Sequence, residues 1–101
     1  MHTYRDVYDE IRNRRGYGEA ESYQREIERD GHSLHGSVWS QRNAVNGCQN
    51  WDNERNAKDA YRSLEYRDER REEEQREQER REEESRARHQ EERQREEEAE
   101  Q

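Results

Sequence analysis

Residues 67–101 have the sequence RDERREEEQREQERREEESRARHQEERQREEEAEQ, and this stretch decides the fold. It consists almost entirely of Glu, Arg and Gln, and its only apolar residues are Ala87 and Ala99. Such a segment cannot bury a hydrophobic core, yet its main residue types favour helix and it contains neither Gly nor Pro. The composition therefore predicts a helix with water on every face.

The order of the charges favours a helix over a disordered chain. Glu precedes Arg by four residues at Glu72/Arg76, Glu77/Arg81, Glu82/Arg86, Glu84/Arg88 and Glu91/Arg95. Each such pair stabilises a helix by about 0.2–0.5 kcal/mol, which outweighs the repulsion within short runs of Glu. No register fills even one heptad with apolar residues at both core positions, so a coiled coil is excluded. We expect a single charged helix that frays near Gln101.

The chain upstream of this stretch has a pattern that can pack. Apolar residues at helical spacing are Tyr4, Val7, Tyr8 and Ile11, followed by Ala20, Tyr23 and Ile27. Thr3 and Asp6 form a loose version of the N-terminal capping box. The spacing predicts a helix over about 4–15 that ends at Gly16, and a second helix over about 19–30.

Residues 31–53 are the least charged part of the chain, rich in Gly, Ser and Asn, and they hold both tryptophans. These residue types are typical of loops. We expect a short helix over about 38–46 with Ser37 as its cap. A strand from Leu34 to Ser40 is the alternative.

A last apolar face consists of Ala57, Ala60, Tyr61 and Leu64. The helix that carries this face begins at Asp52 or Asn53, and no Gly or Pro separates it from the charged stretch. We therefore expect one helix of about 45 residues, about 70 Å long at 1.5 Å per residue. The predicted fold class is all-α: a small helical head over 1–66, with two to three short helices and a loop-rich segment, continuous with a long, highly charged C-terminal helix over 67–101.

Composition and charge restrict the classes of function. Of the 101 residues, 48% are charged and 23% are hydrophobic, which excludes a conventional core for this length. No stretch approaches the roughly 20 apolar residues of a membrane span, and the N-terminus lacks the apolar region of a signal peptide. The net charge of −8 disfavours direct contact with nucleic acids or anionic membranes and favours a protein partner with a basic surface. We expect a soluble, cytoplasmic protein.

Few residues offer the chemistry of a catalytic or metal site. His32, His35 and Cys48 supply three candidate zinc ligands and Asp52 a fourth, but one cysteine without a second paired motif does not match structural zinc sites. Cys48 also lacks the sequence signatures of catalytic cysteines. We expect no enzymatic activity, no metal and no cofactor, with both histidines in a loop and Cys48 in a turn.

Aromatic residues are the best candidates for a binding role. Six Tyr and two Trp stand out in a chain with few aliphatic residues, and these rings suit surfaces where one edge stays in water. We expect Tyr17, Trp39, Trp51 and Tyr61 to contact a partner. The alternative is that these rings form the core.

The favoured function is a non-enzymatic protein–protein interaction module. Small, lightly cored, acidic proteins are common among the inhibitors that viruses and mobile elements direct at host proteins, so we expect that role in the host cytoplasm, with self-association through the head as an additional property. The alternative is a nucleic-acid-linked regulator. It would be an acidic mimic that blocks a nucleic-acid-binding protein, or a weak binder that uses the Arg and Tyr residues of 1–30.

Overall fold

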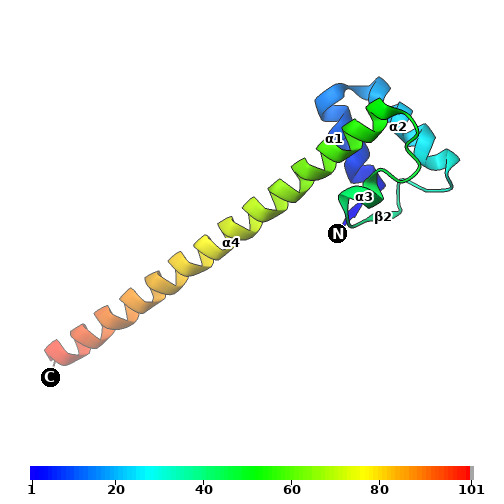
Figure 1. Ribbon diagram of the computed structural model, residues 1–101. Helices are drawn as coiled ribbons and strands as arrows, with labels where there is room; N and C mark the ends of the chain where they lie inside the picture. Colours follow the sequence, from blue (N-terminus) through cyan, green and yellow to red (C-terminus); the bar gives the residue numbers. More distant parts are fainter. Residues whose placement is uncertain (101) are drawn as a thin grey trace. The chain divides into compact units, whose positions relative to one another are not determined.

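A computed structural model describes residues 1–100, with side chains for residues 1–99. The elements, labelled in Figure 1, are β1 (His2–Thr3), α1 (Tyr4–Arg15), α2 (Tyr17–Arg29), β2 (Ser37–Val38), α3 (Gln41–Ala44) and α4 (Trp51–Glu100). The predicted all-α class, a small helical head followed by a long C-terminal helix, is confirmed. Among residues 1–100, no helix combines the length and the apolar character needed to cross a bilayer.

The chain divides into two compact units, and the first of them is Met1–Arg67. We call this unit the head, and the residues from Asp68 onward the tail. The head contains one residue more than the predicted 1–66. That residue matters, because the Arg67 guanidinium forms two contacts with the buried carboxylate of Glu10, at 2.9 and 3.0 Å.

Helix α1 has the predicted bounds because its start and end are encoded locally. The Thr3 hydroxyl accepts a hydrogen bond from the Asp6 N–H at 3.2 Å, and the Asp6 carboxylate accepts one from the Thr3 N–H at 2.9 Å. This is the complete capping box. Gly16 ends α1 with φ +103° and also precedes the first residue of α2. Helix α2 therefore begins two residues before the predicted 19–30.

The loop-rich segment differs most from the prediction. Ser37 and Val38 form a short antiparallel pair with β1, so the strand alternative is correct over two residues. The short helix is confined to α3, and its cap is Ser40, whose hydroxyl accepts the Asn43 N–H at 3.0 Å. Ser37 does not cap a helix because its backbone pairs with Thr3 of β1.

The same loop also satisfies the first amides of α1. The Tyr4 N–H donates to the Gly36 carbonyl at 3.0 Å, and the Arg5 N–H donates to the Leu34 carbonyl at 2.9 Å. These amides have no partner within their own helix. Backbone hydrogen bonds thus join this loop to the start of α1.

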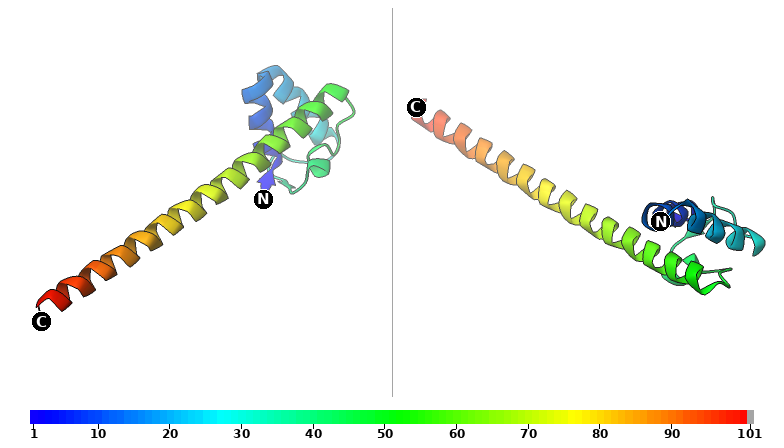
Figure 2. Two further views of the ribbon diagram at one scale, coloured as in Figure 1. Left: turned by 60° about the vertical axis from the view of Figure 1, so that its left-hand side comes forward. Right: turned by 90° about the horizontal axis from the view of Figure 1, so that it is seen from above.

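The hydrophobic core of the head lies between α1, α2, β2, α3 and the first turns of α4 (Figure 2). Its members are Tyr4, Val7, Tyr8, Ile11, Ala20, Tyr23, Ile27, Val38, Ala44, Ala57, Ala60, Tyr61 and Leu64. Tyrosine hydroxyls are satisfied inside it: Tyr23 donates to the Ala44 carbonyl at 2.6 Å, and Tyr4 donates to the Asn43 carbonyl at 3.3 Å. Burial raises the pKa of Tyr23 far above its ordinary value. The core thus combines four tyrosine rings with five branched aliphatic side chains.

Gly47 closes the turn after α3 in a conformation that other residues avoid. Its φ is +86°, and a Cβ placed there would lie 2.8 Å from the Cβ of Asp30. We expect Gly47→Ala to lower the free energy of unfolding by about 1–1.5 kcal/mol in urea denaturation, because backbone strain and the close contact add. Gly18→Ala is the control, since Gly18 lies in α2 with open space around it. Equal stability of the two variants would contradict the expectation.

The tail is helical as far as Glu100, and every side chain of residues 69–99 is exposed. Two of the predicted pairs are formed, with Arg76 and Glu72 at 3.6 Å and Arg81 and Glu77 at 2.8 Å. No apolar packing supports the helix over 69–99. Its stability therefore comes from helix propensity and charge order.

Candidate interaction surface

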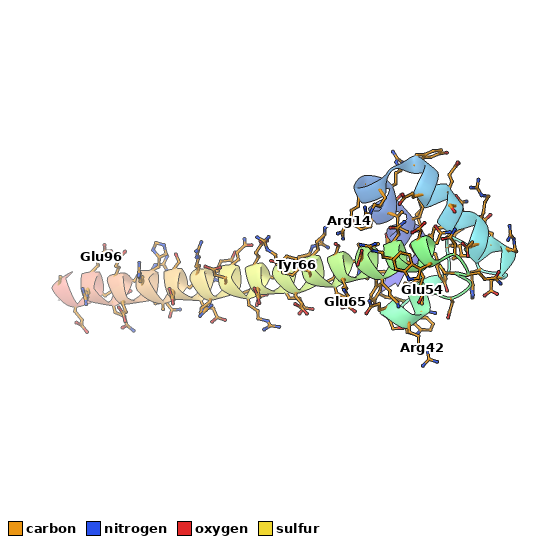
Figure 3. All side chains as sticks on the ribbon, turned by 45° about the horizontal axis from the view of Figure 1, so that its top comes forward. Arg14, Arg42, Glu54, Glu65, Tyr66 and Glu96 are labelled. Carbon is orange, nitrogen blue, oxygen red and sulfur yellow. The ribbon has the colours of Figure 1, made fainter. Side chains whose placement is uncertain are left out.

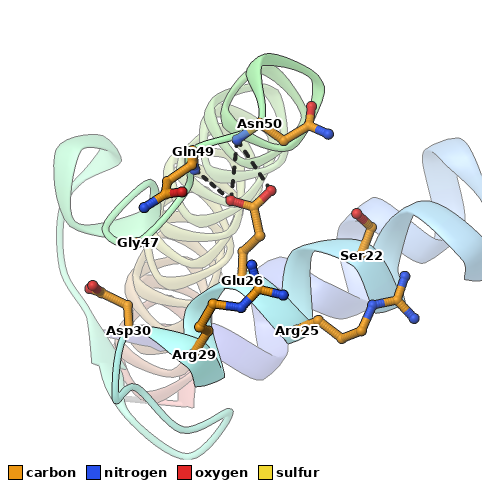
Figure 4. A pocket seen from close by; sticks show the side chains of 8 residues that line it. All are labelled: Ser22, Arg25, Glu26, Arg29, Asp30, Gly47, Gln49 and Asn50. Carbon is orange, nitrogen blue, oxygen red and sulfur yellow. Dashed lines mark hydrogen bonds between the residues drawn. The ribbon is translucent and has the colours of Figure 1, made fainter.

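One hollow of the head lies between α2 and the segment that leads into α4 (Figure 4). It is lined by Ser22, Arg25, Glu26, Arg29, Asp30, Gly47, Gln49 and Asn50. The Glu26 carboxylate accepts hydrogen bonds from the backbone N–H groups of Gln49 and Asn50. These amides directly precede α4, so a residue of α2 caps α4 from outside. A carboxylate is favourable there because the helix dipole is positive at this end.

The Glu26 carboxylate remains ionised in this position. Burial alone would raise its pKa, but the hydrogen bonds from Gln49, Asn53 and Asn50 and the positive charge of Arg29 outweigh burial. The pKa of Glu26 therefore lies below its ordinary value. The Glu26 carboxylate thus already occupies the position where an anionic ligand would bind in this hollow. We therefore assign the hollow a structural role.

A line of polar contacts continues from this cap along the contact between α2 and α4. The Asn53 amide donates to the Ser22 hydroxyl at 3.0 Å, and the Asn56 amide donates to the Glu19 carboxylate at 2.7 Å. Both asparagines are buried. The sequence contains a signal for this line, because Glu19, Ser22 and Glu26 recur at helical spacing.

The histidines and the cysteine lie in ordinary structural surroundings. The Nε2 atom of His32 lies 3.0 Å from the Asp30 carboxylate, and its ring packs against Tyr4 with centroids 5.2 Å apart. His35 is exposed. Burial raises the pKa of Cys48 to about 12, so its thiol is protonated at neutral pH. Within residues 1–100, no three His, Cys, Asp or Glu side chains are grouped to hold a metal ion.

The predicted contact residues fall into two groups. Tyr17, Trp39 and Trp51 are exposed, at 59%, 66% and 68% of their surface. Tyr61 is only 5% exposed and belongs to the core, so its ring is not available to a partner. Tyr66 is exposed and was not among the predicted residues. The core interpretation is therefore correct for Tyr61, and the partner contact of Tyr17, Trp39 and Trp51 stays a prediction.

Trp51 belongs to a cationic region formed by α3 and α4. Two neighbouring hollows share Glu54, Lys58 and Arg62. We call their combined lining the α3–α4 surface, and its residues are Gln41, Arg42, Val45, Trp51, Glu54, Arg55, Lys58, Asp59 and Arg62. Four cations and two carboxylates give it a local charge of +2, opposite in sign to the chain's −8.

The cations of this surface have different surroundings. Lys58 forms an ion pair with Glu54 at 3.0 Å, and the Arg55 guanidinium lies 5.5 Å from the centre of the Trp51 ring. Arg42 and Arg62 are exposed, and Figure 3 shows Arg42 directed away from α3 into solvent. The surface therefore combines an aromatic ring with arginines that can bind carboxylates.

The predicted stacking face for nucleic acid is largely inside the head. Of the four tyrosines of 1–30, Tyr4, Tyr8 and Tyr23 are buried in the core, and only Tyr17 is exposed. Rings in the core cannot stack on bases. The arginines of this region therefore lack most of the aromatic residues that single-stranded nucleic acid would need.

Comparison of the chain with protein-family models, with curated proteins and with solved structures found no match in any of the three.

Proposed function

We propose that this protein is a non-enzymatic protein–protein interaction module whose head binds a partner through exposed aromatic rings. The observation that supports this proposal is the exposure of both tryptophans in a chain that is short of core residues. Trp is the side chain with most to gain from burial, and it is enriched at the energetic centres of interfaces. A partner that covers Trp39 and Trp51 would supply that burial.

The tail fits this function as a spacer and charged arm. Residues 68–101 hold 16 acidic and nine basic residues, and the described side chains of 69–99 are all exposed. A negative arm speeds encounter with a partner that has a basic surface. As part of the same proposal, the module inhibits a host protein in the host cytoplasm, as small viral or mobile-element proteins do.

The exposed tail also favours a second candidate, an acidic mimic that occupies a nucleic-acid-binding protein. Its carboxylates follow a single helix, as phosphates follow a strand, and they are all accessible over 69–98. Such a contact would depend on charge and would weaken steeply with salt. Binding through the tryptophans would not.

Affinity capture from the source cell's lysate tests the proposal. The baits are the full chain, the Trp39→Ser/Trp51→Ser variant and an Arg12→Ser control, which changes an exposed side chain on α1. We expect the full chain and the control to retain one defined protein through a moderate-salt wash, and the double variant to retain at least tenfold less. Circular dichroism of the double variant should match that of the parent.

Two results would contradict the proposal. The first is equal retention of the protein by the double variant and the parent. The second is capture that disappears in moderate salt for every bait, which would instead favour the acidic mimic.

A further inference from the structure

We propose that the α3–α4 surface binds an acidic peptide segment of the partner protein, with an apolar side chain of that segment against Trp51. This inference rests on the proposed function and adds the chemistry of the partner. Its basis is the meeting of cations from two separate elements on one surface, beside the exposed ring of Trp51.

The charges of this surface are arranged to accept carboxylates. Arg42 comes from α3 and Arg62 from α4, and both line the hollow that also contains Val45 and Lys58. A planar guanidinium binds a carboxylate through two parallel hydrogen bonds, which gives both strength and orientation. Two exposed arginines that line one hollow together with Val45 thus match a segment that carries carboxylates near an apolar residue.

A peptide fits better than a nucleic acid. Glu54 and Asp59 lie among the cations, and they would repel a backbone that carries a charge at every nucleotide. A peptide, in contrast, need not carry a charge at every residue. Its carboxylates can lie next to the arginines and away from Glu54 and Asp59.

Charge variants test the inference on the complex of the full chain with the protein captured in moderate salt. Arg62→Glu should weaken binding at least tenfold, because it removes a cation and adds a repulsive charge. Glu54→Gln should strengthen binding about two- to fivefold, because it removes the carboxylate that pairs with Lys58. Arg12→Glu makes the same charge change on α1 and should leave affinity unchanged.

Zero-length crosslinking then identifies the bound segment. Lys58 is the chain's single lysine, so an amide formed by a carbodiimide at this position is readily identified. In the Glu54→Gln background we expect Lys58 to link to an Asp or Glu of the captured protein. Short poly-L-glutamate should displace that protein more effectively than a thymidine oligonucleotide of equal charge.

The outcomes separate this inference from the proposed function. If the Trp39→Ser/Trp51→Ser variant loses binding but the Arg62→Glu variant does not, the head binds its partner without the cations of the α3–α4 surface. The proposal of an acidic segment is then overturned, and the proposed function stands. A Lys58 link to the tail of a second copy, or stronger displacement by the oligonucleotide, also overturns it. If no protein is captured, both proposals fail.

Discussion

Replacement of Arg67 by alanine is expected to lower the free energy of unfolding of the head by about 2–3 kcal/mol. Glu10 is 3% exposed, and its carboxylate is held by both terminal nitrogens of the Arg67 guanidinium. Without that guanidinium, the buried Glu10 carboxylate loses its charged partner, and an unpaired buried carboxylate is costly. Breaking a buried pair costs about 3–5 kcal/mol, and the exposure of Arg67 on its other side reduces this figure.

The measurement is urea denaturation of the full chain, followed by near-UV circular dichroism of the buried tyrosines. Far-UV signals are unsuitable because the helical tail contributes strongly to them. Arg71→Ala is the matched control, since Arg71 is an exposed arginine four residues further along α4. Glu10→Gln in the Arg67→Ala background should restore part of the loss, because an amide is cheaper to bury than a carboxylate. Identical urea midpoints for Arg67→Ala and Arg71→Ala would refute the importance of the pair.

Replacement of Glu26 by glutamine is expected to cost about 1.5–2.5 kcal/mol at neutral pH. The carboxylate accepts hydrogen bonds from two backbone amides at the start of α4 and from Asn53. Bonds to a charged acceptor contribute about 1.5–3 kcal/mol, and the helix dipole strengthens them. A neutral amide retains one acceptor but directs its own N–H groups toward the same donors.

The contribution of Glu26 should also depend on pH. Its pKa is lower in the folded protein than in the unfolded chain, so its stabilisation is complete above the ordinary glutamate value of about 4.3 and is lost as pH falls through the folded value. The difference in unfolding free energy between the parent and Glu26→Gln should therefore shrink in acid. Glu28→Gln, an exposed carboxylate on the same helix, is the control. A difference that stays constant from neutral to acid pH would show that Glu26 acts without its charge.

Local signals allowed a correct prediction wherever the structure depends on neighbouring residues. The capping box of Thr3 and Asp6 and the apolar face that follows it lie within one segment, and α1 has the predicted bounds. Gly16 was identified as the end of α1, but its second role before α2 depends on its φ of +103°, which a sequence does not display. The helix of the tail was predicted correctly because the side chains of 69–99 are exposed and local preference decides the conformation there, whereas the predicted fraying near Gln101 lies outside the described residues.

Predictions were incomplete where residues distant in sequence meet. Ser37 has the sequence context of a helix cap, but the pairing with β1 joins it to a segment more than 30 residues away. Glu26 finds its partners 23 and 24 residues later, so nothing in its own helix marks it as a cap. Arg67 was assigned to the charged stretch by composition, although its partner is the buried Glu10.

The aromatic residues show the same limit. Tyr61 and Trp51 lie on the same helix, and each has a polar edge that suits either a core or an interface. Only the surrounding helices decide between them: Tyr61 faces the core, whereas Trp51 lies in the first turn of α4 with its ring in solvent. Burial of a tyrosine also needs an acceptor for its hydroxyl. Tyr23 finds one in the carbonyl of Ala44, a residue that sequence analysis placed in a loop-rich segment.

The composition of the core has a thermodynamic consequence. Eight of its 13 members are alanine or tyrosine and five are branched aliphatic residues, so much of the buried side-chain surface belongs to small methyl groups and hydroxyl-bearing rings. The heat capacity of unfolding rises with exposed apolar area and falls with exposed polar area. The head should therefore have a small heat-capacity change for its size and a shallow stability curve. Its folded population then varies little over the temperatures at which most cells grow.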